Sequence, residues 1–198
     1  MNRFGVIFIV ALVGGMFVVP AQGEVPQPSE LEIQTLTPID SLPTKEELVT
    51  NVTGPDQVGR LEELALNPTV DFGIQLRAIR AIPHFCGTPC SGSARTALLN
   101  LLSRISPTDH SGQTILRLRA VIEALGIARS GDPADVDLLV PYLDNASRDI
   151  RAAAARGLRD MCQSTAIVPL RARYQHEQVD QVRLAISAAL RDLDQCSQ

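Results

Sequence analysis

The stretch GDPADVDLLVPYLDNASRDIRAAAARGLRD, residues 131–160, decides the fold. It opens with a helix start signal, because Asp132 suits the N-cap position and Pro133 suits the first helical position. Apolar residues then recur at helical spacing as far as Leu143. A short polar turn follows, and a second helix begins around RAAAAR. The stretch therefore predicts two helices joined by a tight connection.

The second helix contains four successive alanines, Ala152 to Ala155. Such small side chains fill little space, but they allow another helix to approach closely, and alanine has the highest helix propensity. We interpret the run as a surface for close helix–helix packing, in preference to the wall of a ligand pocket.

The same pattern recurs along the chain. DIRAAAARGLRD (149–160) aligns without a gap with QVRLAISAALRD (181–192), and RLRAVIEALGIA (117–128) and QLRAIRAIPHF (75–85) are earlier, weaker copies. Each copy follows a segment with helical apolar spacing, at residues 56–67, 94–105, 134–145 and 164–175. The two best copies lie 32 residues apart. Helical repeats of about this length predict an all-α fold, a short α-solenoid of about four antiparallel helix pairs.

The segment DPADVDLLVPYLDNASRDIRAAAARGL resembles the HEAT-repeat family, in particular the short bacterial HEAT-like repeats of the phycobilin-lyase type. The resemblance lies in the acidic-Pro start, the first helix that contains Pro141, the polar turn, and IR followed by alanines and GL. It extends over about residues 56–193. The resemblance implies a non-catalytic scaffold that binds a protein or peptide partner on a curved surface.

The N-terminal segment predicts export. Residues 1–23 have the features of a signal peptide: Arg3, an uncharged apolar run, and the small residues Ala21 and Gly23 before Glu24. We therefore expect a periplasmic or secreted protein that has no membrane partner once the segment is cleaved. The competing interpretation is an uncleaved membrane anchor.

Two further segments complete the predicted organisation. Residues 24–55 contain several prolines without a sustained apolar period, which predicts a linker or a loosely docked arm. Within it, Thr44 and Glu47 have the spacing of a capping box and indicate a short helix. Residues 56–198 form the predicted repeat domain.

Composition and motifs argue against several classes of function. The 198-residue chain has a formal charge of −4, so it lacks the basic excess expected of a nucleic-acid-binding protein. We found no paired nucleophile and base and no glycine-rich phosphate loop. The sequence therefore predicts a protein that is not an enzyme and needs no cofactor.

The four cysteines are an even set in a compartment that permits disulfides, and three pairings are open. We favour a small closed loop between Cys86 and Cys90, and a link between Cys162 and Cys196 that would pin the last repeat. The alternative is a metal-binding or thiol-redox site built from His84, Cys86 and Cys90.

Four arginines, at positions aligned between the copies, are the remaining candidates: Arg77, Arg119, Arg151 and Arg183. We predict a structural ladder in which each arginine binds a nearby carboxylate, with Asp71, Asp149 and Asp180 as the suggested partners. The alternative is a basic stripe that binds a partner. In a third hypothesis, residues 24–54 are the binding element and the solenoid displays them.

Overall fold

The computed structural model describes residues 27–38, 41–106 and 109–196, and the predicted signal peptide lies outside them. These ranges contain helices and no strands. None of the helices described is both long enough and apolar enough to cross a membrane. The elements are α1 (Glu30–Leu36), α2 (Lys45–Asn51), α3 (Gln57–Leu66), α4 (Phe72–Ala81), η1 (Ile82–Phe85), α5 (Ser93–Ser103), α6 (Gly112–Ala128), α7 (Pro133–Leu139), η2 (Val140–Asp144), α8 (Arg148–Met161), η3 (Ser164–Ala166), α9 (Ile167–His176) and α10 (Asp180–Cys196).

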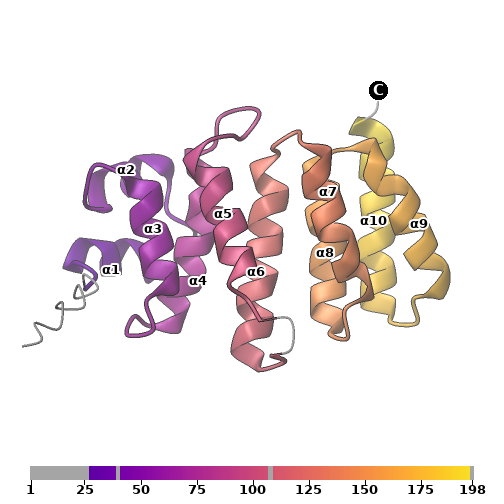
Figure 1. Ribbon diagram of the computed structural model, residues 1–198, viewed down its shortest axis with the longest axis horizontal. Helices are drawn as coiled ribbons and strands as arrows, with labels where there is room; N and C mark the ends of the chain where they lie inside the picture. Colours follow the sequence, from indigo (N-terminus) through magenta and orange to yellow (C-terminus); the bar gives the residue numbers. More distant parts are fainter. Residues whose placement is uncertain (1–26, 39–40, 107–108, 197–198) are drawn as a thin grey trace, which may run out of the picture.

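Four helix pairs follow one another along the long axis of the molecule (Figure 1). They are α3–α4, α5–α6, α7–α8 and α9–α10. The second helices form a continuous row, because α6 packs against both α4 and α8, and α8 packs against α10. The predicted all-α solenoid of four helix pairs is confirmed.

The third pair begins as its sequence predicts. The Asp132 side chain accepts a hydrogen bond from the Ala134 amide, and Pro133 is the first residue of α7. The α-helix becomes a 3-10 helix at Val140, directly before Pro141. Proline has no N–H to donate and its ring crowds the preceding turn, which accounts for the change of helix type.

The alanine run of α8 lies between its neighbouring helices. Ala152, Ala153, Ala154 and Ala155 have no exposed surface, and α8 contacts α6 on one side and α10 on the other. The interpretation of this run as a close-packing surface is confirmed.

The described part of the predicted arm differs from a linker. Its helices α1 and α2 both begin with a capping box, and the predicted one joins Thr44 to Glu47. Leu36 and Leu48 are fully buried, so both helices contribute to the core. Each helix is only seven residues long, which explains why the sequence shows no sustained apolar period. The segment is a docked cap on the first repeat.

A buried ion pair fixes this cap. Glu32 of α1 accepts hydrogen bonds from Nε and Nη2 of Arg60 on α3, at 2.8 and 2.9 Å, and is fully buried. Burial alone would raise the pKa of Glu32, but hydrogen bonds from Arg60, Ser29 and Thr53 outweigh it and lower the pKa to about 2. The ionised carboxylate therefore links the cap to the first repeat.

Candidate functional site

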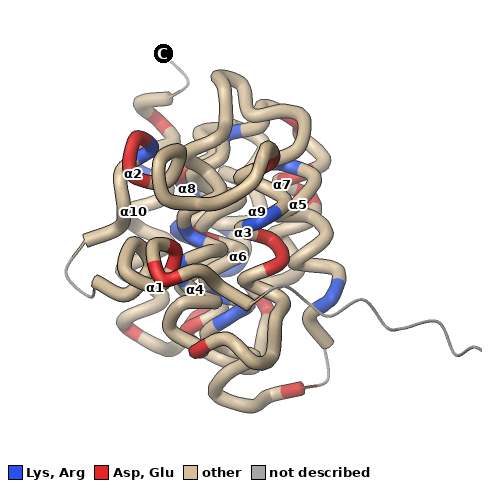
Figure 2. The backbone as a smooth tube through the Cα atoms, turned by 90° about the vertical axis from the view of Figure 1, so that its left-hand side faces the viewer, with Lys and Arg blue, Asp and Glu red and all other residues tan. Residues whose placement is uncertain are grey.

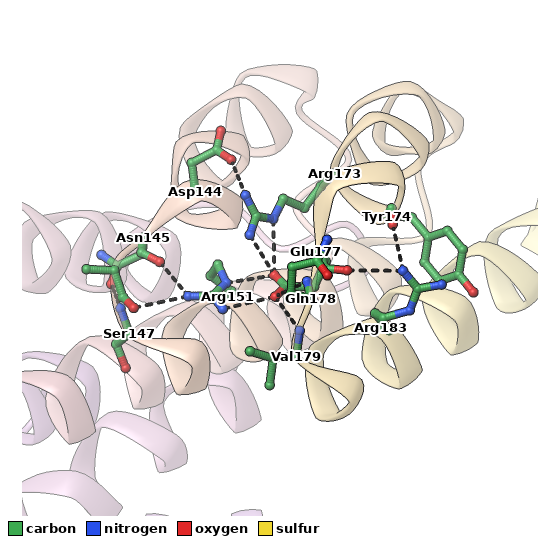
Figure 3. Close-up of polar contacts among 11 residues, drawn as sticks. Asp144, Asn145, Ser147, Arg151, Arg173, Tyr174, Glu177, Gln178, Val179 and Arg183 are labelled. Atoms are coloured by element: carbon green, nitrogen blue, oxygen red, sulfur yellow. Dashed lines mark hydrogen bonds and ion pairs between the residues drawn. The ribbon is translucent and has the colours of Figure 1, made fainter.

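The four aligned arginines do not form one ladder. Arg151 is buried and makes a bidentate ion pair with Glu177, with Nε–Oε2 and Nη2–Oε1 distances of 2.8 and 3.0 Å (Figure 3). Arg119, the aligned residue of the preceding repeat, has a side chain that is 39% exposed and pairs with Glu123 of its own helix. The ladder prediction is therefore corrected.

A one-residue shift between the repeats explains the difference. Leu125 and Leu158 are both buried core residues, and they lie 33 positions apart. Arg151 precedes Leu158 by the same number of residues as Leu118 precedes Leu125, so Leu118 is the residue that corresponds to Arg151. Leu118 is also buried. Arg119 therefore occupies the next position around the helix and faces outward.

The other two arginines have individual partners. The guanidinium of Arg183 lies 4.5 Å from the Tyr174 ring centroid and donates to the Glu177 carbonyl oxygen at 3.0 Å (Figure 3). Arg77 donates to the carbonyl oxygen of Ser41 at 3.1 Å. Both bind backbone oxygens in place of the expected carboxylates.

The carboxylates that were expected to hold this ladder do not pair with it among the described residues. Asp71 caps α4 by accepting hydrogen bonds from the amides of Gly73 and Ile74. Asp149 and Asp180 lie in the first turns of α8 and α10, where negative charge interacts favourably with the helix dipole.

Glu177 is a structural centre between the last two repeats. Besides Arg151, it accepts hydrogen bonds from Arg173 and from the amides of Gln178 and Val179 (Figure 3). The hydrogen bonds from Arg151 outweigh burial, and together with those from Arg173 and Val179 they lower the pKa of Glu177 to about 2. Because the Glu177 carboxylate is buried and its acceptor capacity is used, it is not available to a ligand.

The exposed face of α6 is different. Leu116, Arg119, Glu123 and Ile127 follow a helical spacing that places them on one side of α6, and we call them the α6 stripe. Leu116 and Ile127 are 42% and 56% exposed. The α6 stripe thus presents two apolar side chains, with a charged pair between them, in the middle of the row of second helices.

Two neighbouring helices add charge to the stripe. Guanidinium groups from three successive second helices surround the Glu123 carboxylate: Arg119 at 3.0 Å, Arg156 of α8 at 2.9 Å and Arg80 of α4 at 3.9 Å. We call these four residues the Glu123 cluster. It contains three positive charges and one negative charge.

Sequence reasoning identified Arg119 but missed the other members of the Glu123 cluster. Arg80 and Arg156 are not aligned with the predicted ladder, because they lie elsewhere on their own helices. The available signal was the outward face of each second helix, which can be read from the apolar spacing. The distances between those faces required the packing of α4, α6 and α8.

All four cysteines are paired. Disulfides join Cys86 to Cys90, with Cα atoms 4.6 Å apart, and Cys162 to Cys196, with Cα atoms 5.6 Å apart. As disulfides, Cys86 and Cys90 offer no thiolate to a metal beside His84. In the described ranges, no three His, Cys, Asp or Glu side chains converge to form a metal site.

Stacked antiparallel helix pairs with an exposed row of second helices define the chain as a helical-repeat solenoid. Residues 109–191 match the family model of the HEAT repeats. This match supports a HEAT-repeat assignment for that part of the chain.

No curated protein matches the sequence. A crystal structure of an engineered protein from the Northeast Structural Genomics Consortium is 22% identical in sequence and has a TM-score of 0.41, with 84% of this chain and 80% of that chain covered.

Proposed function

We propose that this protein is an exported, non-catalytic scaffold that binds a protein partner through the exposed face of its second helices. HEAT repeats commonly mediate protein–protein interaction. The observation that carries the proposal is the α6 stripe, in which Leu116 and Ile127 remain exposed on either side of a charged pair. Arginine is enriched at the energetic centres of interfaces, and the buried core of an interface is more apolar than its rim.

Export rests on the sequence of residues 1–23, with its positive start, apolar run and small residues before Glu24. Two disulfides are compatible with an oxidising compartment. Intact-mass measurement of the protein from its native host tests this part. A chain that starts near Glu24 supports export, and a chain that retains residues 1–23 contradicts cleavage.

Site-specific photo-crosslinking tests the binding surface. A benzophenone amino acid replaces Leu116 or Ile127 in the full chain, expressed in the native host, and a control replaces Asn100, an exposed residue of first helix α5. We expect one protein to crosslink from positions 116 and 127 and not from position 100. No crosslink from the α6 stripe, or an equal crosslink from all three positions, would overturn the assignment of the surface.

A further inference from the structure

We propose that the Glu123 cluster binds carboxylate groups of an acidic segment in the partner. This inference rests on the proposed function and specifies its partner. It is based on a local excess of positive charge, on guanidinium donors that remain available, and on the apolar residues beside the cluster.

Most ion-paired arginines of the described chain lie in balanced or acid-rich groups. Arg95 binds both Asp132 and Asp135, and Arg151 and Arg173 share Glu177, while Arg173 also binds Asp144. Figure 2 shows acidic and basic segments interspersed along the tube. The Glu123 cluster is unusual because three guanidinium groups converge on one carboxylate.

The donors of the cluster are accessible. The side chains of Arg80, Arg119 and Arg156 are 34%, 39% and 30% exposed. A guanidinium group has five N–H donors, and Arg119 and Arg156 each donate one hydrogen bond to Oε1 of Glu123. Arg80 lies 3.9 Å from Oε2, beyond hydrogen-bond distance. The unused N–H groups can form bidentate hydrogen bonds with an incoming carboxylate.

The Glu123 carboxylate orients these donors before a partner arrives. It holds the long side chains of Arg119 and Arg156 in place, which reduces the entropy that they lose when a ligand binds. It also offsets part of their mutual repulsion. An incoming carboxylate therefore meets an arranged group that still has two positive charges in excess.

The α6 stripe indicates the sequence pattern of the partner. At a helical rise of about 1.5 Å per residue, Leu116 and Ile127 lie about 10 Å and about 6 Å along the axis from Glu123. A complementary segment would therefore carry acidic residues with apolar residues within that distance on both sides. An amphipathic acidic peptide meets this requirement.

A peptide of defined sequence tests the inference. The probe is a fluorescein-labelled peptide of Glu-Glu-Leu triplets, and its control replaces every Glu with Gln. Anisotropy titrations use the mature protein with both disulfides formed. We expect the Glu peptide to bind, the Gln peptide to bind at least about tenfold more weakly, and the affinity to fall as salt screens the charges.

Matched variants locate the binding site. The triple variant Arg80→Gln, Arg119→Gln and Arg156→Gln should bind the Glu peptide at least about tenfold more weakly than wild type does. The control removes the same charge from exposed arginines outside the cluster, with Arg104→Gln, Arg148→Gln and Arg171→Gln. Glu123→Gln should increase the affinity, because it removes the competing negative charge while the amide oxygen still accepts the hydrogen bonds that orient Arg119 and Arg156. That gain would not follow from a simple loss of structure.

Three results would overturn the inference: no binding of the Glu peptide at low salt, equal loss in both triple variants, or equal affinity for the Gln peptide. If the cluster variant melts at a lower temperature, Arg80→Gln alone replaces it, since Arg80 makes no hydrogen bond in the cluster. If the triple variant still crosslinks to the partner from a benzophenone amino acid at position 116, the scaffold proposal stands and acidic recognition fails. If the crosslinker at position 116 or 127 captures no protein even when the Glu123 cluster is unchanged, the proposed function itself fails.

Discussion

A Cβ atom placed on Gly126 would lie 2.6 Å from the Cα atom of Gly157. A Cβ on Gly157 would in turn lie 2.9 Å from the carbonyl oxygen of Ile122. The backbones of α6 and α8 therefore touch at this point, where only glycine leaves enough room. The contact sets the spacing between the second helices of two successive repeats.

Gly126→Ala should destabilise the protein, because its methyl group would meet backbone atoms that cannot rotate away. We expect a loss of about 1–3 kcal/mol in the free energy of unfolding, measured by urea denaturation. Gly112→Ala, in the first turn of the same helix, is the control, since a Cβ there has no neighbour within 4 Å. Equal stability of the two variants would contradict the close approach.

Arg151→Met should cost about 3–5 kcal/mol, because it leaves the buried carboxylate of Glu177 without its bidentate partner. Arg119→Met should cost less than about 1 kcal/mol, because its ion pair with Glu123 is exposed to solvent. Chemical denaturation of both variants makes the comparison. Similar losses of stability in the two variants would show that Arg119 and Arg151 are equivalent, as the sequence alignment suggests.

Acid should destabilise the protein through Glu177. The Arg151 hydrogen bonds lower its folded-state pKa to about 2 from the ordinary value of 4.5, despite the opposing effect of burial. The stability that this shift contributes is fully present above pH 4.5 and is lost as the pH falls towards 2. At pH 5 the Glu177→Gln variant should be less stable than wild type. Between pH 5 and pH 3 its melting temperature should fall by less than that of wild type, as measured by thermal melts. Parallel curves for the two proteins would show that Glu177 does not contribute.

The cap formed by α1 and α2 should unfold together with the repeats. Leu36→Ala removes a fully buried side chain and should cost about 2–5 kcal/mol. Leu31→Ala on the same helix is the control, because Leu31 is 51% exposed. If the segment were a loosely docked arm, neither variant would shift the main unfolding transition.

The disulfide between Cys162 and Cys196 should stabilise the last repeat. It closes a loop with a sequence separation of 34, so its removal should cost about 3–4 kcal/mol by the loop-entropy relation. Replacing Cys86 and Cys90, which are only four positions apart, should cost less. Thermal melts of the two double-serine variants test which disulfide stabilises the protein more. A larger loss of stability in the variant without Cys86 and Cys90 would contradict the prediction.

The candidate site was less predictable than the fold. Alignment of the repeats selected Arg119 and Arg151 as equivalent residues, but a shift of one residue turns a helix by about 100° and therefore separates a buried arginine from an exposed one. Arg80 and Arg156 do not occupy the repeat position of Arg119, so the alignment did not group them with it. The three meet because side chains on adjacent helices converge wherever the helix spacing and rotation allow it.

The sequence alone determined the number and order of the helix pairs, since apolar periodicity, caps and prolines act over a few neighbouring residues. It also marked the alanine run of α8 as a close-packing surface. The tertiary structure decided the contact between Gly126 and Gly157, the partner of Arg151, and the docking of α1 on α3 through Glu32 and Arg60. These features join residues far apart in the chain, and their geometry depends on how whole helices pack, which no local pattern encodes.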